Sequence, residues 1–274
     1  MSSEQNLKAK NPTQLQLSCL LEHFQNGRLN DAEKLAVSIT KEFPEHQYAW
    51  KVLGAVFGAT GRKSEAVDAN QTAVTLSPQD AAAHNNLGIT LHELDRLDEA
   101  EASYTQAIAL KPDFAEAHYN MGVTLQALDR LDEAETSYTQ AIVLKPDYAE
   151  AHSNLGNALG EQGRLDEAEA SYRLAIGSKP DYAEAHNNLG NTLQQLGRLN
   201  EAEASLRQAL SLKPDFAEVH GNLGNTLKAL KRLDEAEASY RQALSLKPGY
   251  AEVLCNLGNT LKDLGRLDDA EASY

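Results

Sequence analysis

The histidines are the residues of this chain whose type and spacing first suggest chemistry. Five of them recur at intervals of 34 residues, at His84, His118, His152, His186 and His220. A zinc ion needs its donors at about 2 Å from one centre. Equivalent residues of stacked helices lie about one helix diameter apart, roughly 10 Å. The spacing therefore favours a packing position in a repeated unit over a metal site.

Other catalytic and cofactor patterns are missing from the sequence or have simpler explanations. No serine–histidine–aspartate arrangement is identifiable, and no glycine-rich phosphate loop occurs. The many carboxylates fall where helix caps and solvated helix faces are expected. The sequence therefore predicts a chain with no catalytic site, cofactor or metal ion of its own.

The asparagines occupy the most informative polar positions. Asparagine is a mediocre helix former, so its repeated placement in the middle of helices needs an explanation. On a helical wheel Asn86 lies about 100° from Leu87, and so away from the leucine stripe of its helix. Ten asparagines share this side of the predicted helices: Asn86, Asn120, Asn154, Asn188, Asn222, Asn256, Asn157, Asn191, Asn225 and Asn259.

Two explanations of these asparagines remain open. The amides can bond one another between neighbouring helices and stabilise a stack. Alternatively they can face a groove, where each amide can bind the N–H and C=O groups of a peptide backbone. Lys228 and Lys262 stand at a position that varies between repeats, and they would favour carboxylates in such a groove.

The repeat that carries these residues is best seen in residues 183–216, which hold two amphipathic helical patterns. Gly197 suits the left-handed cap that ends the first helix, because glycine has no Cβ. Asn200 and Glu203 have the spacing of a capping box at the start of the second helix. Pro214 cannot continue that helix. One hairpin cannot bury both apolar stripes, so copies of it must pack together.

A glycine recurs in the middle of the first helix of each repeat, as at Gly88. It costs about 1 kcal/mol relative to alanine there. The position therefore predicts a second helix that crosses too closely for a Cβ, and the recurring Ala100 position is expected on the other side of the crossing.

The repeat recurs along the whole chain, since every proline except Pro12 lies on one grid of 34 residues. Residues 1–12 are predicted to be a disordered lead-in. The expected repeats, numbered one to eight and with the last cut short, are 13–46, 47–80, 81–114, 115–148, 149–182, 183–216, 217–250 and 251–274.

These repeats resemble the tetratricopeptide repeat (TPR), whose pattern is W-x2-L-G-x2-Y, then A-x3-F, then P. Repeat two carries the pattern in Trp50, Leu53, Gly54, Phe57, Ala66 and Pro78. The resemblance implies an all-α, right-handed superhelix of antiparallel helix pairs, with the first helices lining the concave surface. The Asn86 series is similar to the asparagine ladder in the TPR superhelix of O-GlcNAc transferases, which holds extended polypeptide by its backbone.

The resemblance implies a non-catalytic scaffold that binds a protein or an extended peptide in the concave groove. One alternative is the N-terminal substrate-recruiting module of a larger bacterial glycosyltransferase of the O-GlcNAc transferase type. The other is end-to-end self-assembly into a homo-oligomer, because the last repeat would leave an apolar face uncovered. That face would consist of Leu257, Leu261, Leu264 and Tyr274.

The composition of the chain limits the classes of partner and the cellular location that can be expected. The net charge of −15 opposes nucleic-acid binding, which needs clustered lysine and arginine. The sequence contains no run of about 18 apolar residues, so no membrane span is predicted. The polar first residues do not resemble a signal peptide. Cys19 and Cys255 suggest no disulfide framework. We therefore expect a cytoplasmic protein.

Overall fold

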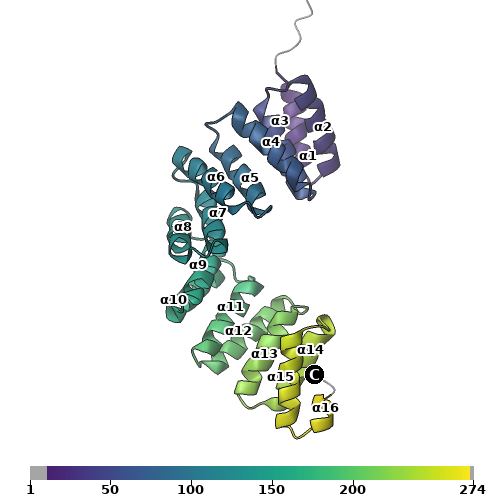
Figure 1. Ribbon diagram of the computed structural model, residues 1–274, viewed down its shortest axis with the longest axis vertical. Coiled ribbons are helices and arrows are strands. Elements are labelled where there is room, and N and C mark those ends of the chain that lie inside the picture. Colours follow the sequence, from purple (N-terminus) through teal and green to yellow (C-terminus); the bar gives the residue numbers. More distant parts are fainter. Residues whose placement is uncertain (1–10, 272–274) are drawn as a thin grey trace, which may run out of the picture. The chain divides into compact units, whose positions relative to one another are not determined.

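The structure is a computed structural model that describes residues 11–271. Over these residues the chain is all α-helical, as the sequence predicts, and has no strand. The helices belong to two compact units, residues 1–144 (unit 1) and residues 145–274 (unit 2). Figure 1 shows the helices of each unit following one another as antiparallel pairs.

Each 34-residue period of the sequence contains one helix pair. The helices of unit 1 are α1 (Gln14–Gln25), α2 (Leu29–Glu42), α3 (Gln47–Ala59), α4 (Lys63–Leu76), α5 (Ala81–His92), α6 (Leu97–Leu110), α7 (Ala115–Ala127) and α8 (Leu131–Leu144). The helices described in unit 2 are α9 (Ala149–Glu161), α10 (Leu165–Ser178), α11 (Ala183–Gln195), α12 (Leu199–Leu212), α13 (Ala217–Ala229), α14 (Leu233–Leu246), α15 (Ala251–Asp263) and α16 (Leu267–Glu271). Every one of these helices is too short or too polar to cross a membrane.

The helices of each unit pack in one consistent manner. The first helix of a pair contacts its own partner, and it also contacts the first helix of the next pair, as α3 contacts α5 and α11 contacts α13. Among the described helices, second helices such as α4 and α6 make no such contact with each other. The odd-numbered helices of a unit therefore form one continuous face, called the odd-helix face below.

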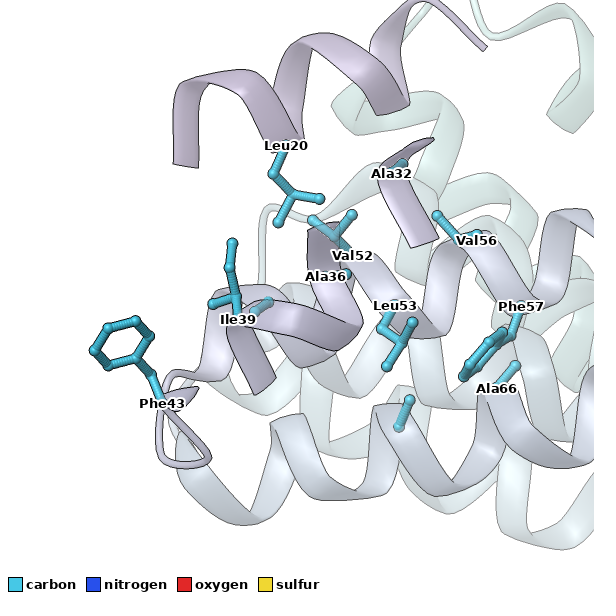
Figure 2. Packing of buried hydrophobic residues seen from close by; sticks show 12 residues of the cluster. Leu20, Ala32, Ala36, Ile39, Phe43, Val52, Leu53, Val56, Phe57 and Ala66 are labelled. Atoms are coloured by element: carbon cyan, nitrogen blue, oxygen red, sulfur yellow. The ribbon is translucent and has the colours of Figure 1, made fainter. Parts of the chain in front are cut away.

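The core is a strip of small and branched side chains between the helices. Figure 2 shows Leu20 of α1 pointing toward Ile39 of α2 and Val52 of α3, and all three side chains are buried. Burying a side chain of this size contributes about 1.5–3 kcal/mol. Alanines such as Ala66 are fully buried, and they let the paired helices approach closely.

The mid-helix glycines mark close crossings, as the sequence predicts. The nearest side chain at Gly88 is Tyr104, whose ring would lie 2.6 Å from an added Cβ, whereas at Gly190 the nearest atoms belong to Leu206 and to the carbonyl oxygen of Ala202, in the predicted alanine position. The arrangement at Gly88 also joins Gly122 to Tyr138 and Gly156 to Tyr172. Glycine is needed at these positions because the tyrosine ring of the second helix leaves no room for a Cβ.

The turn within each pair is held differently from the prediction. Gly197 has φ +75°, as the left-handed cap requires. The predicted capping box of Asn200 and Glu203 is wrong, because α12 begins at Leu199, so that Asn200 lies inside the helix. Arg198 precedes the helix, and its guanidinium group binds Glu201 at 2.6 Å. A bidentate ion pair therefore fastens the turn.

The same arginine position links successive pairs. Arg198 also binds Glu169 of α10 at 2.5 Å, and Arg232 binds both Glu203 of α12 and Glu235 of α14. These contacts give the arginine a structural role, because it joins the turn of one pair to the second helix of the preceding pair. Hydrogen bonds from the arginines lower the pKa of Glu201 and Glu235 below their ordinary value of 4.5.

We expect the protein to lose thermal stability as the pH falls below about 4.5. A carboxylate whose pKa is lower in the folded state contributes stability above its unfolded pKa, and that contribution is lost as the pH falls through the folded pKa. The unfolding midpoint followed by circular dichroism against pH measures this loss. The Arg232→Gln variant should show a shallower acid limb, and a limb identical to that of the wild type would contradict the assignment.

The two ends of the chain differ from the expectations. Residues 1–10 lie outside the described residues, but Pro12 is buried, and Thr13 caps α1 with Gln16 in a reciprocal capping box. At the other end, the expected uncovered apolar face is wrong for Leu257 and Leu261, which are 3% and 0% exposed within the core of α14, α15 and α16. Tyr274 lies outside the described residues.

Candidate functional site

The five repeated histidines bond the proline that precedes the first helix of their pairs. His84 Nε2 lies 3.0 Å from the carbonyl oxygen of Pro78. Since a carbonyl oxygen only accepts, Nε2 carries the proton. Trp50 makes the equivalent bond from Nε1 to Pro44 at 2.8 Å, so histidine replaces tryptophan as the donor. Residues 11–271 contain no cluster of three or more histidine, cysteine or acidic side chains placed to hold a metal ion.

The asparagines form side-chain bonds between neighbouring odd-numbered helices. In each bond an amide nitrogen Nδ2 of one helix donates to an amide oxygen Oδ1 of the preceding odd helix. Unit 1 has the bond from Asn120 to Asn85 at 3.0 Å. Unit 2 has bonds from Asn188 to Asn157 at 3.0 Å, from Asn222 to Asn187 at 3.0 Å and from Asn256 to Asn225 at 2.9 Å. The first explanation of the asparagines, in which the amides bond one another between neighbouring helices, requires bonds of this kind.

Tyrosine hydroxyls complete this network. Tyr172 donates to Asn157 Oδ1 at 2.8 Å, and Tyr240 donates to Asn225 Oδ1 at 2.7 Å. Burial raises the pKa of both phenols, so the hydroxyls keep their protons. Each amide oxygen accepts two bonds, which determines which way the amide is turned.

The predicted binding residues all lie on odd-numbered helices, but they are not equivalent. Nine of the ten asparagines are half-buried, and Asn259 is exposed. Lys228 is half-buried and pairs with Asp263 at 3.7 Å, whereas Lys262 is exposed. A lysine already paired with an aspartate is a weaker site for a carboxylate than the sequence suggests.

One open cavity in unit 2 brings several predicted residues together. It has a volume of ≈ 360 Å³ and lies between α9 and α11. Polar side chains form much of its wall. The lining includes Asn157, Gly160, Tyr172, Asn188, Asn191 and Gln195.

Unit 1 contains a second cavity, of ≈ 190 Å³, between α3 and α5. Its wall is more apolar. The lining includes Gly54, Ala55, Gly58, Asn70, Asn86 and Ile89.

The two cavities occupy the same place in the repeat, three repeats apart. Gly58 is equivalent to Gly160, and Asn86 is equivalent to Asn188. The other repeats carry phenylalanine, histidine, glutamine or lysine at the position of Gly58. Neither cavity was predicted from the sequence. The two glycines were the available signal, because a missing side chain at this position opens the odd-helix face.

Comparison of the sequence with protein families agrees with this architecture. The family described as Tetratricopeptide repeat matches residues 21–81, 119–183 and 187–251, which together make up more than half of the chain. A second TPR profile matches residues 90–129, and a third matches residues 69–102 and 239–272. No match was found among proteins with curated functions.

Solved structures with the same fold include the Cut9–Hcn1 hetero-tetramer of the APC/C, with 19% identity and a TM-score of 0.74. That match covers 88% of this chain and 48% of the other, so this chain spans about half the length of that relative. YrrB, described as a TPR protein with an unusual peptide-binding site, is 22% identical with a TM-score of 0.58, covering 69% of this chain and 97% of that one.

A further similar structure is a TPR protein from Parabacteroides merdae, with 17% identity, a TM-score of 0.67 and coverage of 90% of this chain and 97% of that one. These likenesses concern the fold. The repeated glycine–tyrosine crossings and the proline-bound histidines agree with the matching family profiles. The chain therefore belongs to the tetratricopeptide repeat family.

Proposed function

We propose that this chain is a non-catalytic scaffold that holds an extended polypeptide by its backbone on the odd-helix face of unit 2. The observation that carries the proposal is the open cavity lined by Asn157, Asn188, Asn191 and Gln195. A surface of carboxamides offers both donors and acceptors, which match the alternating N–H and C=O groups of a peptide. As a TPR protein it has the general role of a protein-interaction scaffold.

The asparagine bonds between neighbouring odd-numbered helices are called the asparagine ladder below. The cavity also contains hydrogen-bonding groups that this ladder does not use. Asn191 is half-buried at the cavity wall, and its side chain has no hydrogen-bond partner among the described residues. Asn188 uses one amide hydrogen for Asn157. Gln195 is exposed at the edge. The ladder thus positions the helices while these neighbouring amides remain available to a ligand.

The chemistry of the wall favours backbone over side-chain recognition. Gly160 adds no side chain, so a ligand can approach the amides closely. Lys262 is the exposed lysine of the two predicted to favour a carboxylate, and it remains a proposed contact for one. YrrB, which shares this fold and is described as having a peptide-binding site, supports the proposal at the level of the fold. A cytoplasmic location and self-assembly remain predictions of the sequence.

Replacing Asn191 with alanine should weaken backbone binding about tenfold, since one or two hydrogen bonds of about 0.5–1.5 kcal/mol each are lost. The unfolding midpoint should stay close to that of the wild type, because Asn191 takes no part in the ladder. Fluorescence anisotropy with a labelled Gly–Ser peptide measures the affinity. The probe offers only backbone and small side chains.

Two variants control this experiment. Gln208→Ala, on the exposed surface of α12, should bind like the wild type. Asn188→Ala should lose both affinity and stability, because Asn157 then loses one of its two donors. Equal affinity of the Asn191→Ala variant and the wild type would reject the backbone groove.

A further inference from the structure

We propose that the cavity of unit 2 binds an arginine side chain of the polypeptide that lies on the odd-helix face. The inference rests on the proposed function, because it takes the ligand of that face to be a polypeptide. It adds a preference for one side chain to the binding of backbone. The guanidinium group is placed between the carboxylate of Glu161 on α9 and the amide oxygens of Asn188 and Asn191 on α11.

The cavity wall contains one charged side chain, the carboxylate of Glu161. Burial raises the pKa of the Tyr172 phenol on the same wall, and the negative charge of Glu161 raises it further. The charge of Glu161 therefore acts inside the cavity. A cationic side chain is favoured there over a neutral or an anionic one. The net charge of −15 favours a cationic ligand in the same direction.

Amide oxygens on α11 give the cavity further hydrogen-bond acceptors. Asn188 Oδ1 accepts one bond, from Asn187 Nδ2 at 3.3 Å, and an amide oxygen can accept two. Asn191 adds a second amide to the same wall. A carboxylate has about four acceptor sites, so Glu161 can accept from a ligand in addition to its bonds within the chain. The cavity therefore presents acceptors from both of its helices.

A guanidinium group matches acceptors arranged in this way. It carries five N–H donors in one plane, so two of them can bind a carboxylate while others reach an amide across the cavity. The ammonium group of lysine has three donors at one point and is more strongly hydrated. Gly160 leaves the approach open, since nothing lies within 4 Å of a Cβ added there. Leu165 offers an apolar contact to the methylene stem of arginine.

The equivalent cavity of unit 1 lacks this combination. The carboxylate on its wall, Glu93, lies 4.0 Å from the ammonium group of Lys63, which also donates to the carbonyl oxygen of Glu93. Lys63 and Glu93 are equivalent to Leu165 and Gln195 in unit 2. Because the carboxylate of unit 1 already has a lysine beside it and the walls are more apolar, the preference for arginine is assigned to unit 2 alone.

The position of Glu161 allows its charge to be removed without unfolding the protein. Glu161 is the last residue of α9, where the helix dipole disfavours a carboxylate. It is also exposed, and exposed ion pairs contribute little to stability. The Glu161→Gln variant keeps the shape of the side chain and removes only the charge. Its unfolding midpoint should stay within a few degrees of that of the wild type.

The test uses the full chain and the labelled Gly–Ser peptide with its central residue replaced by arginine, citrulline or lysine. Citrulline has the length and planar shape of arginine but carries no charge. In fluorescence anisotropy the arginine peptide should bind about five- to tenfold more tightly than the citrulline peptide, the usual effect of a charge-assisted hydrogen bond. Equal affinity of these two peptides would overturn the inference. A lysine peptide bound as tightly as the arginine peptide would overturn the choice of a guanidinium group.

Two variants locate the preference on the molecule. Glu161→Gln should remove it, so that the arginine and citrulline peptides bind alike. Glu93→Gln makes the same change of charge at the cavity of unit 1 and should leave the preference intact. A preference that survives Glu161→Gln, or that falls equally in both variants, would show that the negative charge of the whole chain attracts arginine, and the site would be rejected.

The unmodified Gly–Ser peptide separates this inference from the proposed function. It carries no cationic side chain, so Glu161→Gln should bind it as tightly as the wild type does. If arginine is not preferred but Asn191→Ala still weakens the Gly–Ser peptide, only the arginine site is rejected. If Asn191→Ala leaves the Gly–Ser peptide unchanged while a preference for arginine depends on Glu161, only the backbone groove is rejected.

Discussion

Replacing Tyr240 with alanine is expected to reduce the free energy of unfolding by about 3–5 kcal/mol, the usual cost of removing a buried aromatic side chain. Tyr240 is fully buried, and its ring lies against Gly224 at the centre of its helix pair. Its hydroxyl also donates to Asn225, which receives a second bond from Asn256 of the next pair. The substitution therefore leaves a cavity and weakens one bond of the ladder.

Urea unfolding followed by circular dichroism measures this loss. Because stability in a repeat array is close to a sum of local terms, hydrogen exchange should show the largest change in α13 and α14. Tyr240→Phe is the matched control, since it keeps the ring and removes one hydrogen bond, at a cost of about 1 kcal/mol. A Tyr240→Ala variant as stable as Tyr240→Phe would mean that the ring does not support the crossing.

Two glycines of α9, one turn apart, are expected to respond to alanine in opposite directions. A Cβ at Gly156 would lie 2.7 Å from the ring of Tyr172, and overpacking of this kind costs about 1–3 kcal/mol. At Gly160 nothing lies within 4 Å, so Gly160→Ala should gain about 0.5–1 kcal/mol from the lower backbone freedom of alanine in the unfolded chain. Thermal and urea unfolding of the two variants measure the difference.

The pair is its own control, because helix propensity changes equally at both positions. If both variants gain stability, Tyr172 can move aside at little cost, and the close crossing does not constrain the fold. Gly160→Ala also adds a methyl group beside the cavity of unit 2. The Gly–Ser peptide should therefore be measured with it, and affinity similar to that of the wild type would place the ligand away from this residue.

The helical periodicity and the spacing of Gly and Pro were enough to predict the helix pairs. Leu189 and Leu193 predict one buried stripe, and both leucines are buried on α11. Gly197 predicts a left-handed end to the same helix, and it has φ +75°. The buried stripe and the helix end depend on residues that are close together in the sequence, so both can be predicted from the sequence.

The start of the second helix could not be predicted from the spacing of nearby residues. Asn200 and Glu203 have the spacing of a capping box, yet the helix begins before Asn200. The competing interaction comes from Arg198, which binds Glu201 nearby and Glu169 of the preceding pair. The residue spacing within one repeat does not predict an ion pair with the preceding helix pair.

What the sequence by itself determined is the repeating helical hairpin, because burial of apolar stripes and the caps at glycine and proline act over a few residues. Only the tertiary structure decided that the ring of Tyr104 lies against Gly88, and that Gly58 and Gly160 open cavities. A helical pattern specifies which side of a helix a residue occupies. The register in which two helices cross depends on the volumes of side chains on both, and that register decides which residues meet.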